Sequence, residues 1–304
     1  FIHDSTLPRY SEAASLGLIM AVLAMFLAFA YLWAVRNADR FVVLSGKRRE
    51  QVSIRLTKRG KRFAWGFVGT YFTIGTGLPL LMLLWASGMP FLQVPSLAAM
   101  ENWNLNAYRN VLPMVPGLLK NNLLLMLVVP TLGVILAACM AWVGTRFKNR
   151  MRKGIDVIVM LAVAVPSIVG ALGFLAFGLM VNKYIAIYGT IWLIAITMAA
   201  RYLTWANRTI ASAMMQIHPE IEEAGLVSGI RKGRTFVSII LPNVARSLLI
   251  SWFWLALLSL RDLTIPIMLS RRGTDVFSTA IWGLNSSGVT DEAAALSVIL
   301  ALFV

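Results

Sequence analysis

Long uncharged, apolar runs constrain this chain more than any other feature. A helix needs about 20 predominantly apolar residues to cross about 30 Å of hydrocarbon. A backbone that faces lipid must satisfy its own hydrogen bonds, so such runs predict membrane helices. The predicted spans are residues 13–35, the first two-thirds of 63–100, 121–145, 157–182, 184–200, 247–260 with its continuation, and a seventh from 293 onward. The expected fold is all-α, a polytopic bundle of transmembrane helices.

Composition agrees with a membrane protein. Hydrophobic residues make up 59% of the chain and charged residues 13%, against about 45–50% and about 25% in soluble domains. The single cysteine, Cys139, lies in an apolar run and is predicted to be a packing residue, which excludes a disulfide framework and a cysteine metal site within this chain. The first run follows Arg9 and Glu12, precedes a basic loop and lacks a small-residue cleavage site, so it predicts an anchored helix and not a signal peptide.

The basic residues indicate topology. Of the 28 Lys and Arg residues, 21 fall in or beside three alternate loops, within 36–62, within 146–153 and around 201–246. By the positive-inside rule these loops are cytoplasmic, and the first helix runs from outside to inside. The net charge of +15 therefore does not predict a nucleic-acid partner, because no aromatic-basic platform or helix-turn-helix pattern accompanies it.

The chain divides into two parts at a change in composition. Residues 1–62 supply one helix and a long basic linker, whereas residues 63–304 supply a denser set of helices. We expect a fused tandem of membrane modules, in which 1–62 is the last helix of an upstream module plus a cytoplasmic linker. Residues 63–304 are then the second module, with its core at 118–304. Because the chain starts without Met and stops in an apolar run, we expect a fragment cut within its last helix.

One polar, glycine-broken segment stands out against this apolar background: PEIEEAGLVSGIRKGRTFVSIILP at 219–242. Pro219 suits a first helical turn, the glutamates after it place negative charge at the positive end of the helix dipole, and Gly229 can end the helix. A helix of about ten residues is predicted on the cytoplasmic side. Residues spaced i, i+3, i+4 and i+7 give it one small, weakly apolar face: Ile221, Ala224, Gly225 and Ser228. Such a helix either docks in a groove of another protein or rests on the membrane surface.

The spacing within this segment resembles the EAA-loop signature of permease subunits of binding-protein-dependent ABC importers. The residues that carry the resemblance are Glu223-Ala224-Gly225, then Gly229, then Ile239-Ile240-Leu241-Pro242. The family usually has a second alanine where this chain has Gly225, which lowers helix propensity by about 1 kcal/mol.

The resemblance extends over nearly the whole chain. The stretches 121–129, 164–175, 188–196, 208–225 and 257–269 are similar to the second half of fused permeases of the ferric-iron type. In that group a basic linker with a Ser/Thr-Gly-Lys follows the first module, and Ser45-Gly46-Lys47 matches it. The resemblance implies a type I ABC importer permease fold, multi-pass in the bacterial inner membrane.

The resemblance also implies a division of labour. The EAA loop would couple the chain to a cytoplasmic ABC ATPase dimer, through Glu222, Glu223, Ala224, Gly225, Gly229, Ile239, Leu241 and Pro242. A periplasmic solute-binding protein would deliver the solute, and the upstream module of the same polypeptide would complete the permease in the lipid bilayer. The chain lacks GxxxxGK[ST], so it is not expected to be an enzyme. It would bind no cofactor, and ATP with Mg would be used by the partner ATPase.

The solute implied by the resemblance is ferric iron. Permeases for aminoethylphosphonate, polyamines and sulfate have a similar architecture, so a small organic solute is the alternative. A channel or a membrane enzyme is the alternative of a different class. An enzyme would need a catalytic constellation, but the chain has only His3 and His218, and neither HExxH nor GxSxG. No metal site is predicted.

Three further features carry open alternatives. Arg261 and Asp262 lie inside the apolar stretch 248–269, where ionisable residues are costly unless they are paired or face water. They either line a translocation path or snorkel from the outer end of a helix.

Trp103 and Tyr108 lie in an external loop at 96–117 that either receives the binding protein or forms a simple interfacial helix. Four prolines are predicted to bend membrane helices, as hinges or as fixed shape: Pro79, Pro130, Pro166 and Pro266.

Overall fold

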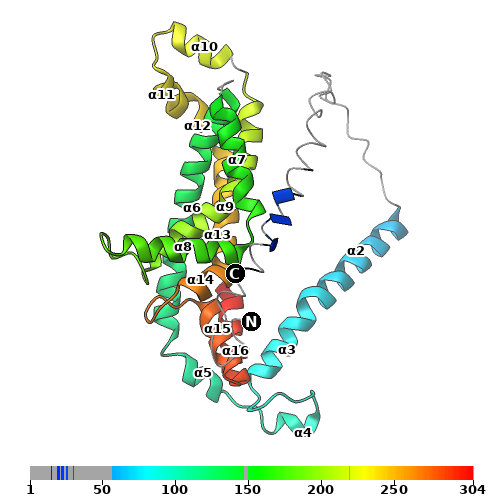
Figure 1. Cartoon of the computed structure of the whole chain (residues 1–304). Coiled ribbons are helices and arrows are strands. Elements are labelled where there is room, and N and C mark those ends of the chain that lie inside the picture. Colours follow the sequence, from blue (N-terminus) through cyan, green and yellow to red (C-terminus); the bar gives the residue numbers. More distant parts are fainter. Residues whose placement is uncertain are drawn as a thin grey trace. The chain divides into compact units, whose positions relative to one another are not determined.

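The computed structural model describes residues 57–146, 150–218 and 220–303, together with a few single residues between 15 and 30. Those residues form helices and turns without strands (Figure 1), which confirms the all-α prediction for the described chain. Most of the predicted span 13–35, most of the basic linker and Ser45-Gly46-Lys47 lie outside the described residues. The described residues form two compact units, one built on 117–279 and one on 57–116 with 280–303.

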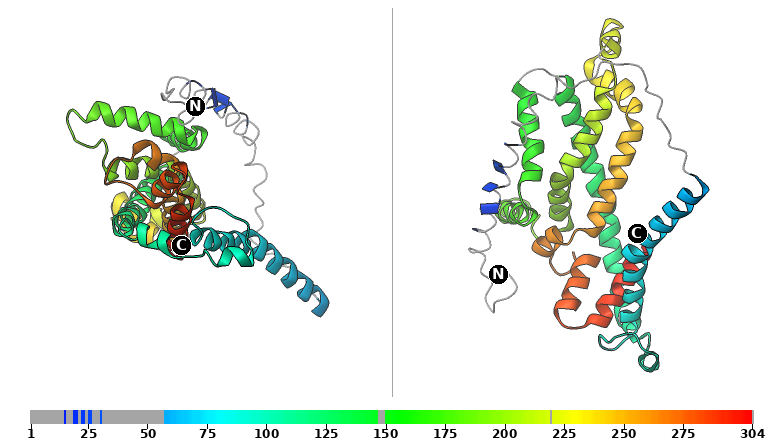
Figure 2. Two further views of the ribbon diagram at one scale, coloured as in Figure 1. Left: turned by 90° about the horizontal axis from the view of Figure 1, so that it is seen from below. Right: turned by 90° about the vertical axis from the view of Figure 1, so that its right-hand side faces the viewer.

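The first unit is a helical bundle. Its elements are α6 (Val115–Arg146), α7 (Arg150–Ala164), α8 (Ser167–Val181), α9 (Ile191–Met215), α10 (Glu220–Val227), α11 (Lys232–Thr235), the π-helical turn η3 (Phe236–Ile240), α12 (Leu241–Asn243), α13 (Ala245–Arg261) and α14 (Thr264–Leu269). Helix α9 packs against α7, α8, α13 and α14, and Figure 2 shows it within the column of this unit. The bundle is therefore organised around α9.

Polar side chains of α9 tie it to its neighbours. Asn207 donates from Nδ2 to the carbonyl of Ala137 on α6 at 3.3 Å. The buried hydroxyl of Thr204 donates to the carbonyl of Val159 on α7. Interhelical bonds of this kind help to hold helices together where lipid offers no hydrophobic driving force between them.

The predicted membrane spans agree with the structure in part. Among the described residues, two helical stretches are long and apolar enough to cross a bilayer, Lys58–Ser87 and Val115–Arg146, and two bent pairs raise the number to four if each is one span. The second stretch contains the predicted span 121–145 and continues through the buried Pro130. Pro79 is the second residue of α3, within the first stretch, so neither Pro79 nor Pro130 breaks its helix.

The predicted span 157–182 is broken. Gly154–Ala164 and Ser167–Val181 meet at an angle of 109°, because Pro166 lacks an N–H and disfavours helical backbone in the residue before it. The predicted span 184–200 also differs. Helix α9 begins only at Ile191 and extends to Met215.

The second unit contains α2 (Lys58–Phe72), the π-helical turn η2 (Thr73–Gly77), α3 (Leu78–Ser87), α4 (Leu97–Met100), α5 (Asn106–Val111) and α16 (Thr290–Phe303). Helix α15 (Phe277–Ser286) connects the units along the chain. Helix α16 packs against α3 and α5, and Asn110 on α5 donates to Glu292 on α16 at 2.8 Å.

The predicted external loop 96–117 is not one interfacial helix. It holds the short helices α4 and α5 and then the start of α6. The Tyr108 hydroxyl lies 2.8 Å from Ser87 Oγ, and the Trp103 indole covers Gly88 so closely that a side chain there would collide with it. The loop is thus folded back onto the end of α3.

Candidate functional site

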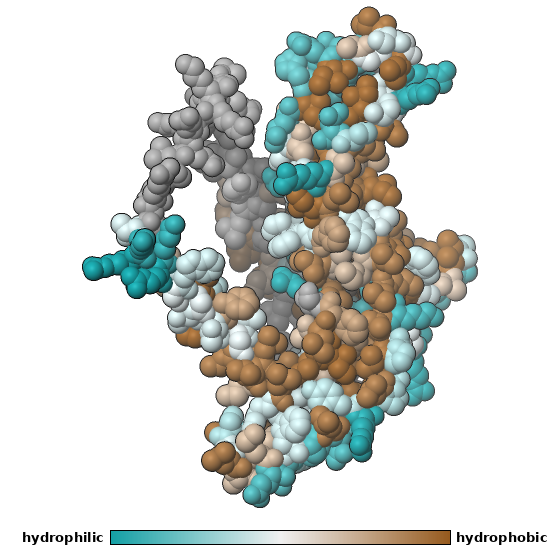
Figure 3. Space-filling model, turned by 180° about the vertical axis from the view of Figure 1, so that it is seen from behind, coloured by the Kyte–Doolittle hydropathy of each residue, from teal (hydrophilic) through white to brown (hydrophobic). Residues whose placement is uncertain are grey.

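The EAA segment, described over residues 220–242, begins with a short helix at one end of the first unit. Helix α10 comprises 8 residues, against the ten or so predicted, and Figure 1 shows it at the end of the bundle beyond α6 and α9. Polar residues gather around this end, whereas apolar residues cover most of the remaining length of the column (Figure 3). The first turn carries three glutamates, Glu220, Glu222 and Glu223, which complement the positive end of the helix dipole.

Gly229 ends this helix as predicted. Its φ is 79°, in the left-handed region that favours glycine. The N–H of Ile230 donates to the carbonyl of Gly225 at 2.9 Å, the six-to-one bond of a Schellman cap. The chain therefore turns at Gly229 for a backbone reason, since no other atom lies within 4 Å of the place of a Cβ atom.

Gly225 faces inward, which corrects the predicted apolar face. Ile221, Ala224 and Ser228 are exposed, but Gly225 is buried. A Cβ at Gly225 would lie 3.3 Å from Thr235 Oγ1 and 3.6 Å from Ile239 Cδ1. The close approach of α10 to this following segment leaves little room for a Cβ atom at Gly225.

The two central glutamates of α10 have different surroundings. Glu223 is exposed. Glu222 forms an ion pair with Arg146 at the end of α6, and the two side chains are only 18% and 13% exposed. Arg146 also donates from Nη2 to the carbonyls of Met214 and Ile217, at 3.2 and 3.0 Å, where α9 ends. One guanidinium thus joins α6, the end of α9 and α10.

A second contact ties the same end of α6 to the loop. The Trp142 and Phe236 rings stack with their centroids 4.6 Å apart and their planes 24° apart. Phe236 begins η3, and the chain then passes through the partly buried Leu241 and the exposed Pro242 before α13 begins at Ala245. The segment Lys232–Asn243 meets α13 at 75°, so Pro242 lies just before a bend.

Sequence reasoning missed Arg146 and Trp142. The sequence identifies Arg146 only as one of the basic residues that indicate the cytoplasmic side. The available signal was its place as the first charge after the uncharged run 121–145, but the sequence contains no information on which carboxylate it meets. Contacts between α6 and α10 join residues 76 positions apart and follow from the packing alone.

Arg261 and Asp262 are not brought near the EAA segment. They lie at the far end of α13. This helix has 17 residues, so at 1.5 Å per residue it places them about 25 Å from the end of the EAA segment. Arg261 is exposed, and Asp262 is half-buried with an extended backbone between α13 and α14. Its carboxylate accepts a hydrogen bond from the Tyr202 hydroxyl and another from the Ile265 N–H, the latter at 3.3 Å.

The described residues contain no group of three or more His, Cys, Asp or Glu side chains that could hold a metal ion. Helix α10 instead presents exposed acidic and small side chains, Glu223 and Ala224, and is joined to the bundle by the Arg146–Glu222 ion pair.

Comparisons with known proteins agree with this geometry. Over 295 residues the chain is 22% identical to the Fe(3+)-transport system permease protein FbpB 2 of Haemophilus influenzae, covering 96% of this chain and 55% of that protein. The chain thus spans about half the length of this relative. It is 26% identical over 189 residues to the sulfate transport system permease protein CysT of Escherichia coli, covering 58% of this chain and 67% of that protein.

Solved structures show the same fold. A bacterial alginate ABC transporter, solved in complex with an alginate pentasaccharide-bound periplasmic protein, matches with a TM-score of 0.59 at 18% identity, over 81% of this chain and 91% of that chain. Residues 130–304 match the family described as binding-protein-dependent transport system inner membrane component. This chain therefore belongs to the family of binding-protein-dependent transport system inner membrane components.

Proposed function

We propose that this chain is part of the permease of an ATP-driven importer in the bacterial inner membrane. A periplasmic binding protein delivers the solute, and a separate cytoplasmic ATPase dimer drives its passage. The upstream module of the same polypeptide completes the permease. The relative FbpB 2 supports this tandem arrangement, since the chain covers only 55% of that protein.

The observation that carries the proposal is the way in which α10 is attached to the bundle. Its residues Glu223 and Ala224 are exposed, whereas Glu222 is held by Arg146. Force applied to the exposed face of α10 therefore passes directly to the ends of α6 and α9. A helix resting on the membrane surface would need no buried ion pair on its other side.

The proposal is tested with the full-length permease, its ATPase and its binding protein in proteoliposomes. A cysteine at Ala224, in a Cys139→Ala background, should cross-link to the ATPase. A cysteine at Val157, which is also exposed but lies on α7, serves as the control and should not. Binding-protein-dependent ATP hydrolysis and uptake should accompany the cross-link. Failure of the ATPase to associate with the wild-type permease would refute the proposed function.

Ferric iron is the proposed solute. The iron-transport relative matches 96% of the chain, whereas the sulfate-transport relative matches 58%. The competing candidates are sulfate, which that second match favours, and a small organic solute such as aminoethylphosphonate or a polyamine. Uptake of radiolabelled ferric iron should exceed uptake of the other solutes when each is supplied with its own candidate binding protein. Uptake of labelled sulfate alone would replace iron with sulfate.

A further inference from the structure

The first unit contains two separate buried cores. One gathers residues of α6, α8, α9 and α14, including Leu125, Val129, Ala171, Ala199 and Ile265. The other gathers residues of α6, α9, η3 and α13, including Ala137, Leu203, Ile210, Phe236 and Leu255. Along α9 the first core ends at Ala199 and the second begins at Leu203. Arg201 and Tyr202 therefore lie where the two cores meet, and Tyr202 packs against both.

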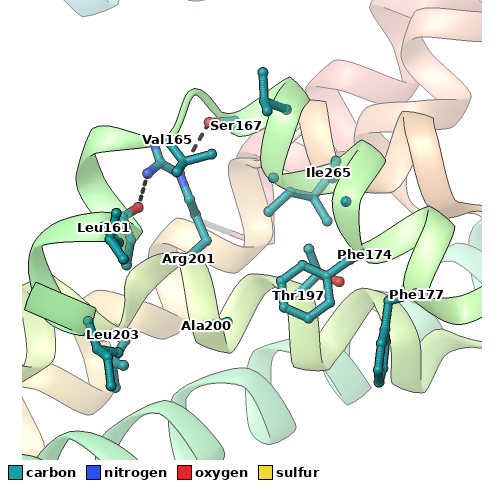
Figure 4. Close-up of a pocket in the computed structure, with 16 residues that line it drawn as sticks. Leu161, Val165, Ser167, Phe174, Phe177, Thr197, Ala200, Arg201, Leu203 and Ile265 are labelled. Carbon is teal, nitrogen blue, oxygen red and sulfur yellow. Dashed lines mark hydrogen bonds between the residues drawn. The ribbon is translucent and has the colours of Figure 1, made fainter. Parts of the chain in front are cut away.

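Arg201 reaches the break between α7 and α8. Pro166 has no N–H, so it cannot give the carbonyl of Ala162 its helical hydrogen bond. Arg201 supplies that bond from Nη1 and donates from Nε to Ser167 Oγ at 3.3 Å (Figure 4). Among the described residues no carboxylate pairs with Arg201. The donors of this half-buried cation are thus directed at the 109° break.

Tyr202 reaches the break between α13 and α14. Its hydroxyl donates to Asp262 Oδ2 and lies 3.4 Å from the carbonyl of Leu258. Asp262 in turn caps α14 at the Ile265 N–H, and its own carbonyl accepts from Ser278 Oγ at 2.7 Å. Pro266, four residues after Asp262, has no N–H to offer that carbonyl. Two adjacent residues of α9 thus hold two helix breaks, of which the first contains Pro166 and the second is followed by Pro266 in α14.

The helices that follow the two breaks are in contact with each other. Helices α8 and α14 pack together and contribute Ala171 and Ile265 to the same core. A largely apolar cavity of about 590 Å³ lies beside the first break, lined from both sides of it by Leu161 and Val165 and by Phe174 and Phe177. Figure 4 shows Arg201 at its wall. A change of the angle between α7 and α8 must therefore change the shape of this cavity.

We propose that Arg201 and Tyr202 are positioning residues of the transport step. They hold the α7–α8 and α13–α14 breaks at the junction of the two cores, so that α8 and α14 change orientation together. This inference rests on the proposed function, and it assigns the two prolines Pro166 and Pro266 to hinges and not to fixed shape.

The first arm of the test measures uptake and uses the missing N–H of Pro166. In the reconstituted full-length permease, Arg201→Gln should lower binding-protein-dependent uptake at least tenfold while the ATPase still associates. Pro166→Ala restores an N–H that can reach the Ala162 carbonyl and should itself lower uptake, because it stiffens the hinge. Adding Arg201→Gln in that background should therefore lower uptake by less than a further threefold. Arg208→Gln, an exposed arginine on the same helix, is the matched control and should leave uptake unchanged. Equal losses with and without Pro166→Ala would overturn the assignment of Arg201.

The second arm measures geometry without transport. Spin labels at Val157 on α7 and Met180 on α8, both exposed, report the angle of the break in a Cys139→Ala background. A narrow distance distribution is expected in the wild type. It should broaden in Arg201→Lys, which keeps the charge but cannot bond both Ala162 and Ser167. It should also broaden in Tyr202→Phe, because α8 packs against α14 and should move with it. Unchanged distributions in both variants would refute the inference.

Failure of the proposed function and failure of the hinge assignment give different results. A wild-type permease that shows no ATPase association and no uptake would refute the proposed function. A wild-type permease that transports, together with Arg201→Gln and Tyr202→Phe variants that transport equally well, would refute the hinge assignment alone.

Discussion

At the scale of single residues, the EAA segment depends on one buried charge pair behind an exposed face. Glu222→Gln removes the negative partner of Arg146 and leaves the guanidinium with the two carbonyls at the end of α9. A hydrogen bond to a charged group contributes about 1.5–3 kcal/mol, so this variant should lower the thermal stability of the detergent-solubilised permease measurably.

The neighbouring Glu223→Gln is the matched control, because Glu223 is exposed. Surface substitutions of this kind usually change stability by less than about 0.5 kcal/mol. Glu223→Gln should therefore leave the melting temperature unchanged and, under the proposed function, weaken ATPase association. Equal melting temperatures for the two variants would mean that the Arg146–Glu222 pair does not hold α10.

Gly229 and Gly233 form a second matched pair. Gly229→Ala forces an L-residue into left-handed backbone at φ 79°, which costs about 1–2 kcal/mol. Gly233→Ala lies in α11 without positive φ, and an added Cβ would meet nothing within 4 Å at either site. Proteolysis of the loop should be faster in Gly229→Ala and unchanged in Gly233→Ala. The same rate in both would rule out backbone conformation as the reason for Gly229.

At the scale of helices, α6 and α13 approach each other closely at Gly133. A Cβ there would lie 2.6 Å from Leu255 Cδ2, and Leu255 is fully buried. Gly133→Ala should therefore destabilise the bundle by about 1–3 kcal/mol through overpacking. Leu255→Val removes the clashing atom, so the double variant should lose less stability than the sum of the single losses.

Thermal denaturation of the solubilised protein measures this non-additivity. Gly173→Ala on α8 is the control, since an added Cβ there meets nothing within 4 Å. Strictly additive losses for Gly133→Ala and Leu255→Val would show that the two helices do not constrain each other at this point.

At the scale of the whole molecule, the positive-inside rule fixes which loops face the cytoplasm. Reporter fusions after Gly233, beside the EAA segment, should report the cytoplasmic side. Fusions after Asn104, in the loop between α4 and α5, should report the outer side. The same side for both fusions would contradict the topology and remove the EAA segment from reach of an ATPase.

Several elements were predictable because their signals are local. The apolar run 121–145 predicts α6, and the acidic start and Gly229 predict α10 and its end. These features depend on hydropathy, helix dipole and backbone conformation, which act within a few residues. The prediction failed at 157–182, where hydropathy continues through Pro166 but the helix does not. Hydropathy measures the free energy of transferring side chains into lipid. It contains no information on whether the backbone continues in one direction or bends.

The sequence by itself determined three properties: the lipid environment of the helices, the all-α class and the position of the EAA segment in the chain. Each follows from composition or from the spacing of nearby residues. Only the tertiary structure decided the partners of the charged side chains. Arg146 meets Glu222, Arg201 meets the carbonyl that Pro166 leaves free, and Tyr202 meets Asp262. In a low-dielectric interior each such group must find a partner. Which partner it finds depends on helices that are distant in sequence and adjacent only in the folded bundle.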